Sequence, residues 1–331
     1  MKIRCGVIGL GRIGCGFDDI DDGKVKTHTG AYLKNTDTEL VAFCDIDKTK
    51  LQKYGRKYHV KSLFTDYKEL FKKTELDLVS ICTHADSHLD IIKEAAKNNV
   101  KGIFLEKPIS DNLKDAAKII QICNKKNIKL QIDHQRRFSE FYIQVKNLVA
   151  KNIGDVKTCN IFYGAGILNT GTHVIDVARF FFGDIQEVSG TASNYRLTND
   201  FNINGIIKFK NGCVCNLQAL DYSIYRILEL DMIGKNGRLR LDIAKNKAES
   251  YLVDSGKKLV YVELEKKEII NKETKEYILS GLENLILAVK SDKNTLCTGL
   301  DGYKSLEGAL GLVKSMKNGG KILQFPLKQH V

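Results

Sequence analysis

The chain has 331 residues, of which 43% are hydrophobic and 28% are charged, and it contains only two prolines. This composition is typical of a globular protein and excludes a collagen, a proline-rich linker and a disordered chain. The 52 basic residues exceed the 40 acidic ones, giving a formal net charge of +12. Because lysines interleaved with acidic residues carry most of this charge, we expect no nucleic-acid partner. The sequence contains no run of about 18 apolar residues, so we expect no membrane span.

The nine cysteines are odd in number and form no CxxC pair. We therefore expect reduced, mostly buried thiols in a cytoplasmic protein, and no metal site. Cys213 and Cys215 lie two apart in a strand-like run and are expected to face opposite sides. The first residues run directly into a strand pattern, which leaves no room for a signal peptide.

The first third of the chain alternates between strand and helix patterns. This alternation predicts an α/β fold, with a doubly wound parallel sheet that has helices on both faces, over residues 1–133. The expected strands are 2–8, 39–44, 76–82, 102–105 and 128–132, and the expected helices are 48–58, 67–73, 88–98 and 113–125.

The pattern changes after about residue 134. A second α/β domain with a large, mostly antiparallel sheet is expected over 134–331, and its terminal helices are candidates for packing on the first domain. Asn211-Gly212 and Asn236-Gly237 are hairpin signals. The expected helices are 139–151, 172–182, 276–291 and 302–318, and the expected strands are 155–163, 201–210, 213–221, 225–233, 238–243 and 258–264.

A glycine-rich segment, Gly9-Leu10-Gly11-Arg12-Ile13-Gly14, follows the first strand. In this context the pattern GxGxxG predicts a loop that binds the pyrophosphate of a dinucleotide, ahead of a helix whose N–H groups meet the phosphates. Gly9 permits the tight turn, Gly11 lets the backbone approach the phosphates, and Gly14 permits close packing of strand and helix. The predicted cofactor-binding residues of this loop are Gly9, Gly11, Arg12, Ile13 and Gly14.

Asp45 ends the second strand, where a carboxylate accepts hydrogen bonds from ribose hydroxyls and repels a 2′-phosphate. NAD is therefore expected rather than NADP. Asp45 lies 45 − 14 = 31 residues beyond Gly14, whereas about 20 is usual. The surplus indicates an acidic insertion around 15–27, which is either a solvated loop or a lid over the active site. Its spacing does not match a calcium-binding loop.

Three further segments carry a resemblance to a known family. Thr83 ends the third strand with His88 five residues later, Glu106-Lys107-Pro108 follows the fourth strand, and the run 171–176 reads Gly-Thr-His-Val-Ile-Asp. With the glycine loop, these segments resemble the Gfo/Idh/MocA oxidoreductases over nearly the whole chain. The resemblance implies a Rossmann domain, an α/β domain with an open sheet, and nicotinamide-dependent redox chemistry at a sugar or cyclitol hydroxyl.

The resemblance also implies roles for particular residues. Lys107 would contact substrate near the nicotinamide, and His173 would be the acid/base. A cis peptide bond is implied at Pro108. The chemistry agrees, because histidine titrates near neutrality and lysine stabilises a developing negative charge. Asn169 stands where many of these dehydrogenases have Asp, which makes a proton relay at that position doubtful.

Several further residues are candidates for roles beside these two. Asp176, three residues after His173, would orient it or bind substrate, unless its role is structural. His28 is a weaker candidate on the phosphate side. His88 is expected either to contact the cofactor or to be a residue at the start of a helix. The further candidates are Asn169, Arg137 and Tyr163 for substrate, and Thr83, Glu106 and Lys107 for cofactor.

These observations favour an NAD-dependent dehydrogenase that acts on a sugar, sugar nucleotide or cyclitol. Two alternatives remain: an NAD-dependent glycoside hydrolase of the same family, and a non-catalytic NAD-binding regulator, which Asn169 keeps open. Amphipathic strands over 201–243 are expected to expose a sheet face, and the resemblance implies that this face pairs subunits in a homo-oligomer, either a dimer or a tetramer.

Overall fold

The computed structural model describes residues 2–20, 23–195, 197, 200–223, 225–253, 262–271 and 276–328. The chain forms two compact units, the first made of residues 1–139 with 275–303 and the second of 140–274 with 304–331. This division differs from two continuous domains meeting at residue 133, because a late segment of the chain groups with the first unit.

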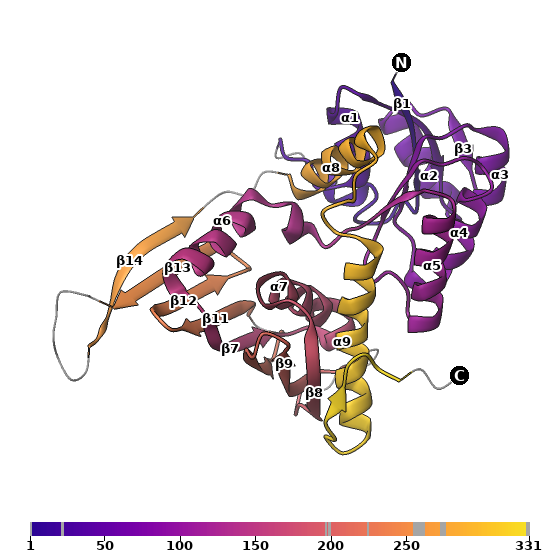
Figure 1. Ribbon diagram of the computed structural model, residues 1–331. Helices are drawn as coiled ribbons and strands as arrows, with labels where there is room; N and C mark the ends of the chain where they lie inside the picture. Colours follow the sequence, from indigo (N-terminus) through magenta and orange to yellow (C-terminus); the bar gives the residue numbers. More distant parts are fainter. Residues whose placement is uncertain are drawn as a thin grey trace. The chain divides into compact units, whose positions relative to one another are not determined.

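The first unit contains six parallel strands in the order β3-β2-β1-β4-β5-β6, which is the Rossmann order. Every residue of β4 and β5 is buried, as expected for strands covered on both faces. The predicted doubly wound sheet is therefore confirmed, with the short β3 as an addition (Figure 1). The strands are β1 (Ile3–Ile8), β2 (Thr38–Cys44), β3 (Ser62–Phe64), β4 (Leu78–Ile81), β5 (Gly102–Leu105) and β6 (Lys129–Ile132).

Polar caps start several helices of this unit. Asp47, Asp66 and Asn112 each accept a hydrogen bond from a backbone N–H in the first turn that follows, which satisfies donors that a helix start leaves unpaired. The helices are α1 (His28–Lys34), α2 (Lys48–Lys57), α3 (Tyr67–Lys73), α4 (His88–Ala95), α5 (Leu113–Lys125) and α8 (Tyr277–Ser291), with 3₁₀ turns η1 (Gly16–Asp19), η2 (Ala85–Ser87) and η3 (Gln135–Phe138).

Helix α8 reaches the first sheet although it lies about 150 residues further along the chain. At Gly281 an added Cβ would lie 2.7 Å from the Phe104 ring and 2.9 Å from the Phe138 ring. The side-chain amide of Gln131 in β6 donates to the Gly281 carbonyl oxygen at 2.5 Å. The missing side chain therefore lets α8 pack closely on β5 and β6.

The helix expected directly after the glycine loop is interrupted by the insertion. Gly11 O accepts from Cys15 N at 3.0 Å, which closes a single turn. The helical ladder of backbone hydrogen bonds resumes after the insertion, where His28 N donates to Ile13 O and Thr29 N donates to Gly14 O, both at 3.1 Å. His28 thus occupies the place of residue 17 in a regular helix, a surplus of 28 − 17 = 11 residues. Subtracting 11 from the Gly14–Asp45 spacing of 31 leaves the usual 20.

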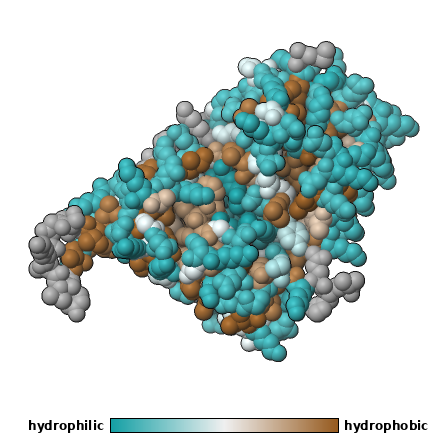
Figure 2. All heavy atoms as spheres, in the orientation of Figure 1, coloured by the Kyte–Doolittle hydropathy of each residue, from teal (hydrophilic) through white to brown (hydrophobic). Residues whose placement is uncertain are grey.

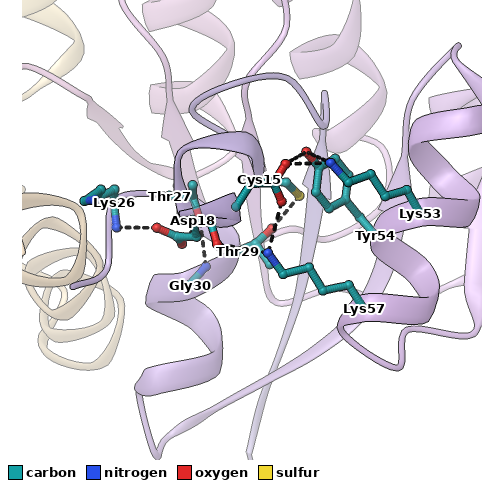
Figure 3. Close-up of polar contacts among 10 residues, drawn as sticks. Cys15, Asp18, Lys26, Thr27, Thr29, Gly30, Lys53, Tyr54 and Lys57 are labelled. Carbon is teal, nitrogen blue, oxygen red and sulfur yellow. Dashed lines mark hydrogen bonds and ion pairs between the residues drawn. The ribbon is translucent and has the colours of Figure 1, made fainter. Parts of the chain in front are cut away.

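Two acidic residues anchor the insertion (Figure 3). Asp18 accepts hydrogen bonds from Lys26 N at 2.8 Å and from the Thr27 hydroxyl. Asp19 accepts from the amino groups of Lys53 at 2.6 Å and Lys57 at 3.0 Å, and from Tyr54 on the same helix, α2. These bonds, chiefly the one from Lys53, lower the pKa of Asp19 to about 2. The described part of the insertion is therefore fixed to its own domain, whereas Asp21 and Asp22 lie outside the described residues.

The second unit contains a nine-stranded sheet in the order β14-β13-β12-β11-β7-β10-β9-β8-β15. Among the described residues of this sheet, only the pairing of β7 with β10 is parallel, so the predicted mostly antiparallel sheet is confirmed. The strands are β7 (Val156–Tyr163), β8 (Ile185–Ala192), β9 (Ile203–Phe209), β10 (Val214–Ala219), β11 (Glu229–Gly234), β12 (Gly237–Asp242), β13 (Lys247–Val253), β14 (Leu264–Asn271) and β15 (Leu323–Gln324).

Several strand boundaries differ from the expected ones. β8 and β13 were not predicted, and the strand expected at 258–264 falls largely on 254–261, outside the described residues. Cys213 and Cys215 were expected on opposite sides, which is wrong. Residues two apart in extended chain share a face, and the two sulfurs lie 3.9 Å apart in the core.

One face of the second sheet packs against helices. Buried residues of α6 (Glu140–Leu148), α7 (Thr172–Phe182) and α9 (Gly299–Lys317), among them Val145, Ile175 and Leu312, form one apolar cluster with inward strand residues such as Ile161 and Ile207. Two π-helical turns flank these helices. The turn η4 (Val149–Ile153) directly follows α6, and the turn η5 (Gly166–Gly171) directly precedes α7.

Hydrophilic residues cover most of the visible face, with smaller hydrophobic patches among them (Figure 2). Within the described ranges, no helix is both long and apolar enough to pass through a bilayer.

The resumed ladder predicts different outcomes for two deletions that both remove the Asp18–Asp19 anchor. Deleting 17–27 removes 11 residues and joins Gly16 to His28 in helical register, so we expect the melting temperature to stay within about 5 °C of wild type. Deleting 17–26 rotates His28 by about 100° and leaves two buried carboxylates without their partner, so we expect a loss of about 10 °C. Differential scanning calorimetry of both variants checks this, and equal melting temperatures would contradict it.

Candidate active site

The glycine loop leaves one position open at the carboxyl edge of the first sheet. Gly9 has φ +92°, and its Cβ would lie 2.7 Å from the Cys82 carbonyl carbon, while a Cβ on Gly14 would collide with Gly9 O. The protein's own packing therefore requires glycine at both positions. A Cβ on Gly11 would meet nothing within 4 Å. Gly11 thus borders free space, which fits a loop over which a dinucleotide's phosphates lie.

Asp45 is held beside this loop by backbone donors. Its carboxylate accepts from Leu10 N at 2.6 Å and from Asp47 N at 2.9 Å. Gly9 N donates to Cys44 O at 2.8 Å, which ties the end of β2 to the start of the loop. The carboxylate is therefore fixed next to the glycine loop, and each of its oxygens keeps a lone pair for a further hydrogen-bond donor.

Arg12 projects from the same loop and is exposed. Its guanidinium lies 4.8 Å from the centre of the Phe17 ring, in cation–π geometry with the first residues of the insertion. Ile13 contributes through its backbone, because its carbonyl accepts from His28 N.

A buried charged cluster, formed by His28, Glu106 and Asp133, lies at the ends of β5 and β6. The His28 Nε2 atom is 3.0 Å from Glu106 Oε1 and 3.7 Å from Asp133 Oδ2, and its Nδ1 is 2.9 Å from the Ser80 hydroxyl. The imidazole packs edge-on against Phe104, with ring centroids 4.6 Å apart. We call these three residues the His28 cluster.

The three charges shift one another's pKa values. Burial opposes a charge on His28, but Cys82 and the two carboxylates outweigh it and raise its pKa well above the usual value. Burial and the neighbouring Asp133 raise the pKa of Glu106 to about 7. Burial of Asp133 is outweighed by its contact with His28, so its pKa is lowered. The imidazolium is thus the cation that compensates the buried carboxylates.

Within the described residues, the His28 cluster is one group whose potential metal-ligand atoms all lie within 4.8 Å of one another. Sequence spacing does not reveal it, because its members come from three separate elements. The atoms already pair with one another as an ion cluster. Asp133 was missed by sequence reasoning, although a polar residue directly after a buried strand of a parallel sheet marks the ligand edge.

Lys107 follows Glu106 directly and is half-buried. The peptide bond between Lys107 and Pro108 is cis, as the resemblance implied. Pro326 also follows a cis bond. Arg137, expected near substrate or cofactor, lies in the first unit and forms an ion pair with Asp301 at 3.1 Å.

The segment after β4 holds two further candidates. The Thr83 hydroxyl accepts from Ser87 at 2.7 Å. His88 is buried, with its ring nitrogens 3.1 Å from Thr83 O and 3.2 Å from Ile109 O, and burial lowers its pKa. These contacts support the structural alternative for His88, as the first residue of α4 that ties the β4 and β5 loops together.

In the second unit, His173 is the second residue of α7 and is half-buried. The turn before it is held by Asp200, whose carboxylate accepts from Leu168 N at 3.1 Å and from Asn169 N at 3.0 Å. The Thr172 hydroxyl donates to Asn169 O at 2.8 Å. Asp200 therefore fixes the run that presents Asn169 and His173. It was missed because it lies about 30 residues further along an irregular segment.

Asp176 and Tyr163 are engaged inside the second unit. Asp176 is 1% exposed and accepts from the Ser305 hydroxyl at 2.9 Å, with Arg179 at 3.9 Å. Tyr163 is fully buried, and its hydroxyl donates to Ile203 O at 2.9 Å and accepts from Ile203 N at 2.8 Å. These contacts favour structural roles, so neither residue belongs to the site proposed below.

Comparison with known proteins agrees with this architecture. The model of the NAD-binding Rossmann-fold domain of the Gfo/Idh/MocA oxidoreductase family matches residues 3–134, and the model of the family's C-terminal α/β domain matches residues 163–323. Among curated relatives, a myo-inositol 2-dehydrogenase of Thermotoga maritima is 24% identical over 344 residues, covering 95% of this chain and 96% of that protein.

Two crystal structures share the fold. A scyllo-inositol dehydrogenase from Lactobacillus casei, with bound NAD(H) and scyllo-inositol, superposes with a TM-score of 0.77 at 21% identity, covering 98% and 99% of the two chains. The WlbA dehydrogenase from Bordetella pertussis, in complex with NADH and UDP-GlcNAcA, superposes with a TM-score of 0.79 at 17% identity, covering 99% and 100%. Because the two domain models of one family together match most of the chain, this protein belongs to the Gfo/Idh/MocA family of oxidoreductases.

Proposed function

We propose that the protein is an NAD-dependent dehydrogenase that transfers hydride between a nicotinamide and a hydroxyl group of a sugar, sugar nucleotide or cyclitol. The observation that carries the cofactor assignment is the open space at Gly11 beside the fixed carboxylate of Asp45. The substrate class rests on the similar proteins, whose names give inositols and, as a bound molecule, a sugar nucleotide.

NAD is proposed over NADP because of Asp45. Its carboxylate is oriented by two backbone N–H groups and carries a negative charge beside the loop. A 2′-phosphate at this position would meet that charge, whereas free ribose hydroxyls donate to it.

Lys107 and His173 are the proposed catalytic residues. Bound NAD would supply the hydride chemistry. His173 would take the proton of the substrate hydroxyl during oxidation and return it during reduction. Lys107 would donate a hydrogen bond to the reacting oxygen and stabilise its negative charge. Asn169, four residues before His173, would hydrogen-bond the substrate without carrying charge.

The fold suggests a second copy of this chain as partner. The face of the second sheet away from the helices exposes Ile206 and Ile233, and a shallow hollow of about 510 Å³ is lined by residues of β8, β9 and β10. We propose that this face pairs subunits in a dimer or tetramer. All nine cysteines are described and none of them forms a disulfide, which supports a reducing compartment such as the cytoplasm.

The glycine loop gives a matched pair of variants for cofactor binding. Gly11→Val adds a side chain in open space, so we expect a folded protein that binds NAD at least about 10-fold more weakly, because the side chain takes the phosphates' place. Gly14→Val collides with Gly9 O, so we expect a lower melting temperature. Isothermal titration with NAD and a thermal melt of each variant separate the two effects. Undiminished NAD binding by Gly11→Val would contradict the assignment.

Turnover tests the dehydrogenase directly. We expect a rise in absorbance at 340 nm with NAD, larger than with NADP, for at least one member of a panel of sugars, sugar nucleotides and inositols. With that substrate, Lys107→Ala should lower kcat by about 100-fold or more, because the reacting oxygen loses its cationic donor. Lys97→Ala, at an exposed lysine of the same domain, is the control. Full activity of Lys107→Ala would rule out its catalytic role.

Light scattering tests the proposed assembly. The wild-type mass should be two or four times the 37.2 kDa of one chain. Ile206→Glu places a charge on the exposed sheet face and should shift the protein towards the monomer. Ile143→Glu on α6 alters another exposed isoleucine and serves as control. A monomeric wild type would rule out this use of the sheet face.

A further inference from the structure

His28 connects the two parts of the first unit that the proposed chemistry needs. Its backbone N–H donates to Ile13 O in the phosphate loop at 3.1 Å. Its side chain reaches Glu106, the residue before Lys107, at 3.0 Å. One residue therefore joins the glycine loop to the turn that carries the proposed catalytic lysine.

The side chain is held in one orientation. Nδ1 pairs with the Ser80 hydroxyl at 2.9 Å, and Ser80 in turn donates to the buried Tyr32 hydroxyl at 2.9 Å. Since Ser80 uses its own proton on Tyr32, its oxygen is left to accept the Nδ1 proton of His28. Phe104 closes one side of the ring. Nε2 is thereby directed at the two carboxylates of the cluster.

The contact of His28 with Glu106 and Asp133 is electrostatic as well as steric. Two buried carboxylates at the ends of adjacent strands would repel each other and lose hydration. The Nε2 proton of an imidazolium lies between them and relieves both costs. Asp133 Oδ1 is buried and has no hydrogen-bond partner among the described residues, and Asp133 Oδ2 also accepts from the neutral amide of Gln135 at 3.3 Å, so His28 supplies the positive charge beside the two carboxylates. The backbone of Glu106 is held by the bond from its N–H to Ile81 O at 3.0 Å, whereas its buried carboxylate would face Asp133 without a cation if the Nε2 proton of His28 were lost.

We propose that His28 is a positioning residue for the reaction: as an imidazolium it fixes Glu106, and through Glu106 the Lys107 turn, in register with the phosphate loop. The proposal rests on the proposed function, because it takes Lys107 as the residue that contacts substrate. His28 itself need not touch substrate.

Two substitutions of His28 test the contacts of its two ring nitrogens separately. His28→Asn keeps a donor near Nδ1 for Ser80 and loses the contact with Glu106, whereas His28→Gln keeps a neutral donor near Nε2. We expect His28→Asn to lower kcat by about 10- to 100-fold, which corresponds to losing a hydrogen bond to a charged group, with KM for substrate within about threefold. His28→Gln should recover most of this loss. Hydrogen exchange of the peptide spanning 103–110 should be faster in His28→Asn than in wild type.

Removing the second carboxylate tests the role of charge. Asp133→Asn combined with His28→Gln leaves one carboxylate beside a neutral donor, so the double variant should be more active than His28→Gln alone. His59→Asn, at an exposed histidine with φ +57° that asparagine tolerates, is the matched control.

The outcomes separate the two proposals. If wild type neither binds NAD nor oxidises any substrate, the proposed function fails, and the exchange rates in the free protein still decide whether His28 holds the turn. If wild type is active and His28→Asn matches it in kcat and in exchange, the positioning role is overturned. Equal losses in His28→Asn and His28→Gln, with no recovery in the double variant, would also overturn it.

Discussion

The arrangement of the first domain depends on two backbone hydrogen bonds, from His28 N to Ile13 O and from Thr29 N to Gly14 O. They resume a helical ladder that an insertion of 11 residues would otherwise end. Because the register is kept, α1 packs as the first helix of a Rossmann domain, and β2 delivers Asp45 beside the glycine loop. The same register places the imidazole of His28 at the ends of β5 and β6. The insertion is thus accommodated as an excursion from the helix, fixed to α2 by Asp19.

Buried and half-buried charges organise each unit in a similar way. In the first unit the His28 cluster balances two carboxylates with one imidazolium at the edge where Lys107 emerges. In the second unit Asp200 accepts from the backbone of the turn that precedes α7 and His173. In both units a carboxylate that the sequence pattern did not single out, Asp133 in the first and Asp200 in the second, belongs to the charged contacts near a proposed catalytic residue. Such groups are costly to bury alone, so their partners are fixed with them.

Particular residues show how far sequence reasoning reached. The glycine loop and the acid Asp45 after the second strand were predicted because each belongs to a motif of few residues, and the cis bond at Pro108 was implied by the family resemblance. The open space at Gly11 and the crowding at Gly9 and Gly14 agree with the roles that the spacing suggested. Tyr163 was expected near substrate but is buried, because its strand is central in the second sheet and its hydroxyl pairs with Ile203. The face shared by Cys213 and Cys215 follows from the period of extended chain and was wrongly assigned.

The sequence by itself determined the alternation of strands and helices, the phosphate loop, the acid at the end of β2 and the family to which the chain belongs, because these are written in short-range periodicity and in compact motifs. Only the tertiary structure decided that His28 meets Glu106 and Asp133, and that α8 returns to the first sheet. These contacts join residues up to about 150 positions apart. Their geometry arises from the packing of strands side by side, which no local pattern in the sequence encodes.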